Sequence, residues 1–347
     1  MKKKIFFPKP VYLLFVCFAA MSLSGCQKAA LEPLTKTGFY FNTVISITIY
    51  DSSKEDLLDD CFALAAQYEN YFSTTVPDSD IAKINAAAGA PVEVHEETIE
   101  LLQAGLSYGD ISDGAFDITI GRLSDLWDFS TKALIDEPEL SPAYLPSPEE
   151  VSQALATVNY QNVLIDDTTV SLKDPTAAID LGGIAKGYIA DKMKEYLNEH
   201  GVNSGFINLG GNFLALGEKP DGNGYRVGIQ YPFEETGDSI AVVTVTDQTV
   251  VTSGIYERYF CVEDVLYHHI LNTKTGYPYD NGLLSVTIIT DKSIDGDALS
   301  TTCFALGLEN GLEFVESLED TEAIFITDDY QLHYTSGIGT DIPFQEQ

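Results

Sequence analysis

Between residues 205 and 290 the chain is dominated by segments with the composition of β-strands, and this run constrains the fold more than any other feature. Each segment carries β-branched or aromatic residues between glycine turns. The predicted strands are 206–216, 225–230, 241–252, 256–262, 266–271 and 283–290. Because these strands follow one another instead of alternating with helices, they favour an α+β fold with a largely antiparallel or mixed sheet and packed helices.

Helices and a few further strands are predicted on both sides of this run. Ser52 to Glu55 has the pattern of a capping box before an apolar helical face, and Ser147 to Glu150 has proline at the first helical position. Gly201 is a natural left-handed stop for a helix that begins near Ile184. The other predicted helices are 79–86, 96–109, 295–307 and 309–318, and the other predicted strands are 44–50, a hairpin over 162–172, 323–327 and 331–335.

The first 25 residues are expected to be an export signal. Lys2 to Lys4 precede an apolar run, 11–24, that is too short to span a bilayer as a mature helix. The sequence Leu-Ser-Gly-Cys at 23–26 resembles the lipobox of bacterial lipoproteins, in which the cysteine is lipid-modified; the alternative is an ordinary signal peptide that happens to contain Cys26. We expect a lipoprotein signal peptide over 1–25, a lipid-anchored tether over 26–36 and a catalytic domain over 37–345. The domain would be anchored to the cell membrane and face the periplasm or the cell exterior.

The chain is strongly acidic, and this restricts its partners. Without the four lysines of the signal, the formal net charge changes from −34 to −38. A protein of this charge repels nucleic acid, which we exclude as a partner. Any anionic ligand therefore needs a locally positive pocket, and the chain has only three arginines, namely Arg122, Arg226 and Arg258.

Three cysteines remain outside the signal and the proposed anchor: Cys61, Cys261 and Cys303. Their odd number and the absence of a C-x-x-C spacing argue against a disulfide framework or a zinc site. All three lie in apolar contexts, so we expect buried free thiols.

The stretch AIDLGGIAKGYIADK at 178–192 places two glycines and a lysine where an apolar strand gives way to a helix. Glycine backbone and a helix start suit a phosphate, because unpaired N–H groups and the helix dipole attract anions. The stretch matches neither of the common nucleotide-binding glycine motifs. By itself it is equally consistent with a tight turn that carries a surface lysine at Lys186.

A second chemical pattern lies at the start of the helix predicted over 295–307. Asp297 and Thr301 are four residues apart, so their oxygens share one face of that helix. A carboxylate with a hydroxyl suits Mg²⁺, which also takes phosphate oxygens as ligands. The alternative for this segment is an N-terminal cap, with Thr301 facing solvent or core.

Seven stretches together resemble the signature blocks of the bacterial FAD:protein FMN transferases, the ApbE family, formerly described as thiamine-biosynthesis lipoproteins. The resemblance runs from about Phe39 to Leu308, with the blocks in the order of the family. The blocks are FSTTVPDSDIAKINAAAG (72–89), DGAFDITIGRLSDLWDF (113–129), AIDLGGIAKGYIAD (178–191), INLGGNFLALG (207–217), VVTSGIYERYF (250–260), YHHILNTKTGYPYDNGLLSVTIIT (267–290) and DGDALSTTCFALG (295–307).

The resemblance implies an ApbE-like fold and a Mg²⁺-dependent enzyme that moves the FMN part of FAD to a threonine or serine hydroxyl of an exported acceptor protein and releases AMP. Such acceptors include FMN-binding subunits of sodium-pumping quinone reductases and Rnf-type complexes. By position, Asp297, Thr301 and the backbone carbonyl of Gly183 match the metal ligands of the family. The positions that match FAD contacts are Phe41, Ala115, Phe116, Asp117, Asp180, Lys186 and Ile270.

The sequence leaves alternatives for the proton acceptor, for Arg258 and for the reaction catalysed. Either His268 or His269 is the candidate to accept the proton of the acceptor hydroxyl, because adjacent strand residues point to opposite faces, and we favour His269. Arg258 either supports the phosphates or pairs with nearby acids. Phe41-Asn42-Thr43 departs from the commoner Met-Gly-Thr, which leaves open an FAD pyrophosphatase that yields FMN and AMP. A separate alternative is a lipoprotein that binds FAD without chemistry.

Overall fold

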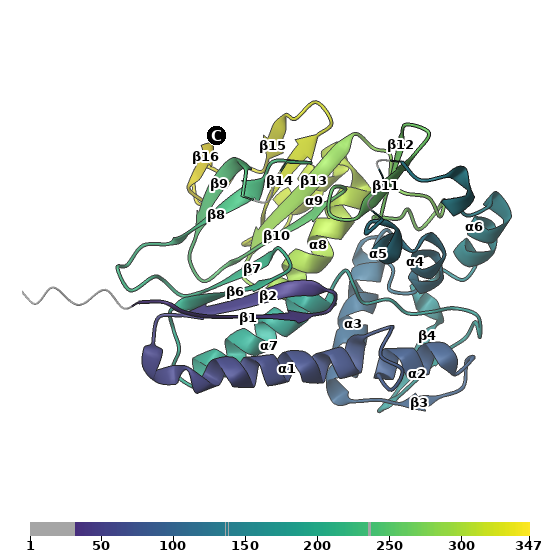
Figure 1. The fold of residues 1–347 in the computed structure, drawn as a ribbon, viewed down its shortest axis with the longest axis horizontal. Helices are drawn as coiled ribbons and strands as arrows, with labels where there is room; N and C mark the ends of the chain where they lie inside the picture. The colour runs from purple at the N-terminus through teal and green to yellow at the C-terminus, as the bar shows by residue number, and fades with distance from the viewer. Residues whose placement is uncertain (1–31, 136, 138, 235–236) are drawn as a thin grey trace, which may run out of the picture.

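The computed structural model describes residues 32–347 apart from 136, 138, 235 and 236 (Figure 1). The predicted signal peptide, Cys26 and residues 27–31 of the predicted tether lie outside the described residues. None of the described helices is long and apolar enough to cross a membrane.

Helices and strands alternate in groups along the chain. The helices are α1 Asp56–Phe72, α2 Asp80–Ala86, α3 Glu96–Ile111, α4 Gly121–Trp127, α5 Phe129–Lys132, α6 Pro148–Leu155, α7 Ala185–Glu199, α8 Ser293–Leu306 and α9 Leu308–Glu316. The strands are β1 Leu34–Tyr40, β2 Thr43–Ile49, β3 Val92–Glu93, β4 Val163–Asp166, β5 Thr169–Leu172, β6 Gly205–Leu209, β7 Asn212–Leu216, β8 Tyr225–Gln230, β9 Ser239–Val245, β10 Thr249–Gly254, β11 Tyr259–Val262, β12 Val265–His268, β13 Leu283–Thr290, β14 Glu322–Thr327, β15 Leu332–Tyr334 and β16 Phe344–Glu346.

One large sheet organises the molecule. In the described part of the chain it has eight strands, in the order β1-β2-β6-β7-β10-β13-β14-β15, and three smaller sheets are β16-β9-β8, β3-β5-β4 and β11-β12. Every pairing between these named strands is antiparallel. The predicted α+β class with a largely antiparallel sheet is confirmed.

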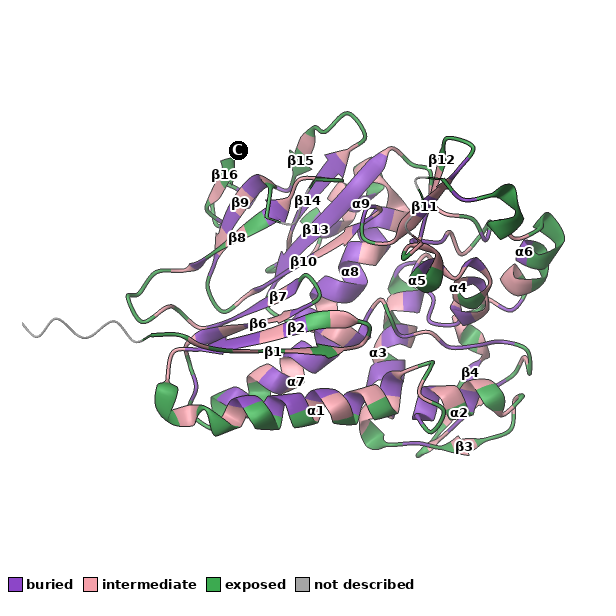
Figure 2. Ribbon diagram, viewed as in Figure 1, coloured by how far each residue is buried: buried purple, intermediate pink, exposed green. Residues whose placement is uncertain are grey.

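The large sheet is covered on both faces, which explains its apolar sequence. Val286 and Ile288 of β13 pack with Phe304 of α8 on one face, whereas Ile289 packs against β8 and β9 on the other. All eight residues of β13 are buried, and Figure 2 shows the buried colour along β13 and α8. A strand with both faces covered carries a continuous apolar run, whereas a strand with one face in solvent alternates apolar and polar residues.

The first strands form a second part of the core with the N-terminal helices. Ile45, Ile47 and Ile49 of β2 are fully buried and belong to one cluster with α1 and α7. The buried residues of α1 recur every three or four positions, as expected for a helix with one apolar face: Leu58, Cys61, Phe62, Ala65, Tyr68 and Phe72. This packing places α7 between the large sheet and α1 (Figure 1).

Two predicted strands are wrong because each contains a turn. The predicted strand 206–216 is a hairpin, in which Gly210 and Gly211 have φ of 61° and 92°. The predicted strand 241–252 is broken near Asp247, with φ of 56°, between β9 and β10. Adjacent residues with positive φ reverse the chain with the twist that a hairpin needs, so the paired glycines were the signal for the first turn.

Several predicted boundaries also shift. β11 begins only at Tyr259 and β12 ends at His268, so both strands are shorter than predicted. β1 begins at Leu34, which pairs with Ile49, and the last three residues of the predicted tether therefore belong to the sheet. The predicted capping box at Ser52 is wrong: residues 52–54 form a 3-10 turn capped by Asp51, whose side chain accepts from the Ser53 N–H, and α1 begins after Glu55 without a side-chain cap.

Other local predictions are confirmed. Ser147 and Glu150 form the capping box of α6, the hairpin over 162–172 is β4 and β5, and Gly201 after α7 has φ of 76°. The three described cysteines are free; Cys61 and Cys303 are buried as predicted, whereas Cys261 is only half-buried.

Candidate active site

Two of the motif blocks run side by side before α7. The N–H of Asp180 donates to the Ile118 carbonyl at 2.8 Å, and the N–H of Gly121 donates to the Ala178 carbonyl at 3.1 Å. Asn85 fixes the same segment, because its side chain accepts from the Ile179 N–H at 2.7 Å and donates to the Ile179 carbonyl at 2.9 Å. Sequence reasoning missed this role of Asn85, although the residue lies within the block at 72–89.

The double glycine forms the turn into α7. The Asp180 carboxylate accepts from the Gly182 N–H at 2.8 Å, which closes the turn. A Cβ atom on Gly183 would lie 3.2 Å from the Phe116 ring and 3.8 Å from the Thr301 hydroxyl oxygen. Residues 116, 183 and 301 are far apart in sequence, yet they meet at this one point.

Lys186 and Asp297 form an ion pair at the start of α7. The Lys186 Nζ lies 3.2 Å from Asp297 Oδ1 and 3.1 Å from the Gly182 carbonyl oxygen. Asp297 is 4% exposed, and its Oδ2 accepts from the Gly187 N–H at 2.9 Å. The carboxylate therefore caps the neighbouring helix α7 and lies beside a cation. The alternative, in which Asp297 is an N-terminal cap of its own helix, is wrong, because Asp297 lies inside α8, which begins at Ser293.

Close packing of α7 on α8 makes this contact geometry possible. A Cβ atom on Gly187 would lie 2.2 Å from the Ser293 carbonyl oxygen, so only glycine fits at this crossing. At the other end of the contact, the Asp191 carboxylate accepts from the Ser293 N–H at 2.8 Å and the Ile294 N–H at 2.9 Å. Burial raises the pKa of Asp191 to about 6, although these two N–H donors oppose the shift.

Hydroxyl groups surround the second predicted ligand. Thr301 Oγ1 lies 3.2 Å from Ser253 Oγ on β10, and Ser253 Oγ lies 2.8 Å from Ser300 Oγ. Ser300 is fully buried, and its hydroxyl donates to the Asp297 carbonyl oxygen at 2.9 Å. Sequence reasoning did not single out Ser253, although it lies within the block at 250–260.

The two adjacent histidines differ in their surroundings. His268 is buried; its Nε2 donates to the Tyr279 carbonyl at 2.8 Å, and its Nδ1 accepts from the Ile270 N–H at 3.3 Å. Both ring nitrogens are thus engaged by backbone, and burial lowers the pKa of His268 to about 4. His269 is half-buried as a residue, and its Nδ1 is buried with no partner among the described residues.

Positive charge gathers beside His269. Burial lowers the pKa of its imidazole to about 3, and the charges of Arg258 and Lys186 add to this effect. The His269 N–H donates to the Arg258 carbonyl at 3.1 Å, which holds the two residues together. Among the described residues, no carboxylate forms an ion pair with Arg258, so the alternative in which Arg258 pairs with nearby acids gains no support.

The 267–290 block also contacts the 113–129 block. The Thr273 hydroxyl donates to the Gly114 carbonyl at 2.7 Å, and the Trp127 indole donates to the Gly276 carbonyl at 2.8 Å. Half-buried Ala115 and buried Phe116 follow Gly114 directly, so this contact fixes their backbone next to the cluster.

Not every predicted FAD contact presents its side chain to the cluster. The Asp117 carboxylate is buried and accepts from the Thr119 N–H, the Thr119 hydroxyl and the Tyr160 N–H, which makes it part of the scaffold. The Ile270 side chain is 5% exposed and belongs to the core with α8. Phe41 lies in the β1–β2 turn with φ of 53°, and its N–H donates to Glu69 Oε1 at 2.9 Å.

The residues present suit a divalent cation of the Mg²⁺ type. Among the described residues, no three His, Cys, Asp or Glu side chains converge, so such an ion would need hydroxyl, carbonyl and substrate oxygens as well. Asp297, Thr301 and Gly183 supply a carboxylate, a hydroxyl and a backbone carbonyl, and hard cations prefer this oxygen set. The Lys186 ammonium between Asp297 and Gly182 shows that positive charge is accommodated at this place.

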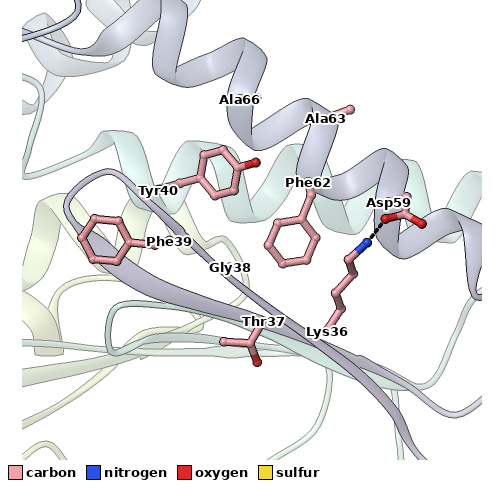
Figure 3. A pocket seen from close by; sticks show the side chains of 9 residues that line it. All are labelled: Lys36, Thr37, Gly38, Phe39, Tyr40, Asp59, Phe62, Ala63 and Ala66. Atoms are coloured by element: carbon pink, nitrogen blue, oxygen red, sulfur yellow. Dashed lines mark ion pairs between the residues drawn. The ribbon is translucent and has the colours of Figure 1, made fainter.

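A separate cavity of about 490 Å³ lies between β1 and α1 (Figure 3). Lys36 and Asp59 form an ion pair at its side, and the Tyr40 and Phe62 rings lie 5.9 Å apart. The lining residues are Lys36, Thr37, Gly38, Phe39, Tyr40, Asp59, Phe62, Ala63 and Ala66. Since none of the predicted site residues is among them, this cavity is distinct from the cluster at α7.

Comparison with known proteins supports a family assignment. The sequence is 38% identical over 279 residues to a Klebsiella pneumoniae (strain 342) protein named FAD:protein FMN transferase, with 80% of this chain and 84% of that protein covered. A Treponema pallidum (strain Nichols) protein of the same name is 32% identical and covers 93% of this chain and 92% of its own length. The crystal structure of the ApbE protein from Thermotoga maritima has a TM-score of 0.79, 31% identity, and covers 88% of this chain and 97% of that one.

The sequence pattern of the ApbE family matches residues 41–325. This span holds every block that forms the cluster around the start of α7. Because the match exceeds half of the chain and agrees with the alignments above, the chain belongs to the ApbE family.

Proposed function

We propose that this protein is an FAD:protein FMN transferase, which moves the FMN part of FAD onto a threonine or serine hydroxyl of an exported acceptor protein and releases AMP. The observation that supports this most is the pairing of Lys186 with Asp297 at the start of α7, beside Thr301 and Gly183. The names of the relatives in Klebsiella and Treponema support the same activity.

The charge distribution suits a diphosphate. The chain as a whole is strongly negative, so an anion needs local cations to approach. The positive charges of Lys186 and Arg258 both lower the pKa of His269, which shows that both lie near it. The first turn of α7 adds the positive end of its helix dipole. We assign the diphosphate bridge of FAD to this positive region.

Asp297, Thr301 and the Gly183 carbonyl would hold Mg²⁺. The ion, when bound, supplies a Lewis acid that neutralises charge on the phosphate oxygens. With Asp297 engaged in this way, Lys186 would be free to bind the phosphate oxygens of the substrate, and the Gly187 N–H would still hold the Asp297 carboxylate in place.

The transfer balances without a further co-reactant. The acceptor hydroxyl oxygen bonds to the FMN phosphorus, and the bond from that phosphorus to the bridging oxygen breaks, so AMP leaves with the electron pair. We assign the hydroxyl proton to His269, because its Nδ1 has no partner among the described residues. Its lowered pKa keeps the imidazole neutral near pH 7 but weakens it as a base, so the negative charge of the bound diphosphate has to raise this pKa for the transfer. His268 has no free nitrogen for this task.

We further propose that the protein is lipid-anchored through Cys26 and faces the periplasm or the cell exterior. The sequence Leu-Ser-Gly-Cys supports this, and a tether of a few residues would join Cys26 to β1. The proposed partners are exported FMN-binding subunits of Rnf-type complexes or of sodium-pumping quinone reductases.

One experiment separates transferase from hydrolase activity. The purified protein is incubated with FAD and Mg²⁺, with and without a candidate acceptor, and mass spectrometry follows the acceptor while chromatography follows AMP. A covalent FMN adduct with matching AMP supports the transferase. AMP release at the same rate with and without the acceptor indicates an FAD pyrophosphatase. Bound FAD without AMP release indicates a binding protein.

Anchoring has its own test. Changing Cys26→Ser should release the protein from the membrane fraction, because serine has no thiol to which the lipid can be attached. Unchanged fractionation of the variant would contradict the lipoprotein assignment, without bearing on the chemistry of the site.

A further inference from the structure

The three hydroxyl groups between β10 and α8 form a chain whose direction can be assigned. A hydroxyl has a single proton, and the Ser300 hydroxyl donates it to the Asp297 carbonyl oxygen at 2.9 Å. A carbonyl oxygen has no proton to offer, so this first bond has one direction only. Ser300 Oγ is then an acceptor for its other neighbour, Ser253, at 2.8 Å.

The bond between Ser253 and Thr301 also has one direction only. Ser253 gives its proton to Ser300, so at 3.2 Å from Thr301 it can only accept. The Thr301 proton therefore points toward β10. Its lone pairs are then left for another ligand. Gly183 is close by, since a Cβ atom on it would lie 3.8 Å from Thr301 Oγ1.

This direction matters to a cation, because a hydroxyl ligates through a lone pair and its proton must face elsewhere. We propose that Ser253 is a positioning residue for the cation site: it takes the Thr301 proton and so turns the Thr301 oxygen toward the ion. The inference rests on the proposed function, since it needs Thr301 to be a ligand.

Ser253 is well placed for a fixed geometry. Val251 and Ser253 lie on the face of β10 that packs on α8, and a Cβ atom on Gly296 would lie 2.9 Å from Val251. Thr252, between them, points to the other face and bonds Thr287 Oγ1 at 2.8 Å. The strand thus offers two neighbouring hydroxyls, of which only one reaches the site.

Loss of the Ser253 hydroxyl would leave the Thr301 proton without its acceptor. The helical alternatives for a threonine are the carbonyls three and four residues earlier, here those of Ala298 and Asp297. Side-chain hydroxyls already donate to both, that of Thr302 to Ala298 and that of Ser300 to Asp297. The Thr301 hydroxyl would then turn its proton toward the cation position, which weakens binding of the ion directly.

The test measures metal binding by the purified full chain and not catalysis. Mn²⁺, which shares the oxygen preference of Mg²⁺, is titrated while EPR follows the free ion, and Mg²⁺ serves as competitor. We expect Ser253→Ala to weaken binding about tenfold, the usual effect of removing a partner of a metal ligand. Ser253→Thr, which keeps the acceptor oxygen, should bind as the wild type does.

Thr252→Val is the matched control, because it removes a hydroxyl from the same strand without reaching the site. It should leave Mn²⁺ affinity unchanged. Equal affinity for Ser253→Ala and wild type, with Asp297→Ala unable to bind, would overturn the role of Ser253 and leave the metal site standing. A wild type with no Mn²⁺ site, or an Asp297→Ala variant that binds normally, would overturn the metal site and this inference together.

Discussion

Asp191 on α7 and Asp297 on α8 each cap the helix that carries the other. Asp191 accepts from the N–H groups of Ser293 and Ile294 at the start of α8, and Asp297 accepts from the Gly187 N–H in the first turn of α7. The two helices are thereby fixed to each other at their first turns. Since the proposed ligands of the ion come from α8 and from the turn that leads into α7, this mutual capping sets the geometry of the site.

Asp297→Asn should separate the two roles of this carboxylate. The amide oxygen still accepts from Gly187, so the melting temperature should stay near that of the wild type, but the negative charge is lost. We expect AMP release to fall by more than about 100-fold, because charge stabilisation of this kind contributes several kcal/mol. Initial rates and thermal unfolding check both parts, and a variant with near-normal rates would contradict the assignment of Asp297.

The adjacent histidines should respond differently to the same substitution. His269→Gln should reduce turnover by about 100-fold or more, as expected for loss of a proton acceptor, with little change in stability. His268→Gln should instead destabilise the fold by about 1–3 kcal/mol, because the Tyr279 carbonyl and the Ile270 N–H lose their hydrogen-bond partner. Chemical denaturation and steady-state rates measure the two effects, and the reverse pattern would mean that the wrong histidine faces the site.

His268 should also make stability fall in acid. Its folded-state pKa is about 4 against an ordinary value of 6.5, so between these values the unfolded chain binds a proton that the folded protein does not. Stability is therefore lost as the pH drops from about 6.5 to 4, by about 3 kcal/mol for this group. The loss should be that much smaller in His268→Gln, and denaturation curves with equal pH slopes would refute this.

Asp191 should instead increase the stability of the fold as the pH falls. Its folded-state pKa is raised to about 6 from 3.8, so the folded protein binds a proton between these values and the unfolded chain does not. The cost of ionised Asp191 is fully present above pH 6 and is relieved as the pH falls toward 3.8. The unfolding free energy of the wild type, minus that of Asp191→Asn, should fall by up to about 3 kcal/mol between pH 4 and pH 7. A constant difference would contradict the raised pKa.

Gly187→Ala should damage both the fold and the site. The new Cβ atom would meet the Ser293 carbonyl oxygen and the Ile294 Cα at 2.2 and 2.6 Å, and both are backbone atoms that cannot turn aside. We expect a loss of about 3 kcal/mol in unfolding free energy, as for other overpacked helix contacts. Denaturation checks this, and an alanine variant as stable as the wild type would show that α7 and α8 do not pack so closely.

The predicted elements were most accurate where local chemistry decides them. The capping box at Ser147, the helix stop at Gly201 and the hairpin over 162–172 depend on neighbours in sequence, and all three are present. The strands 206–216 and 241–252 were predicted as continuous, because apolar residues on both sides of a turn look like one run. Pairing between the two halves, which a single segment does not reveal, decides where such a run folds back.

Composition, periodicity and the ordered blocks are local properties of the chain, and they were enough to predict the α+β class, a largely antiparallel or mixed sheet and the residue types of the candidate site. Which of these residues meet depends on the tertiary structure. It brought Lys186 to Asp297 and Ser253 to Thr301, engaged His268 with backbone, and turned Asp117 and Ile270 into the scaffold. Such contacts depend on how closely α7, α8 and β10 approach one another, and that distance is set by the whole core and not by any one segment.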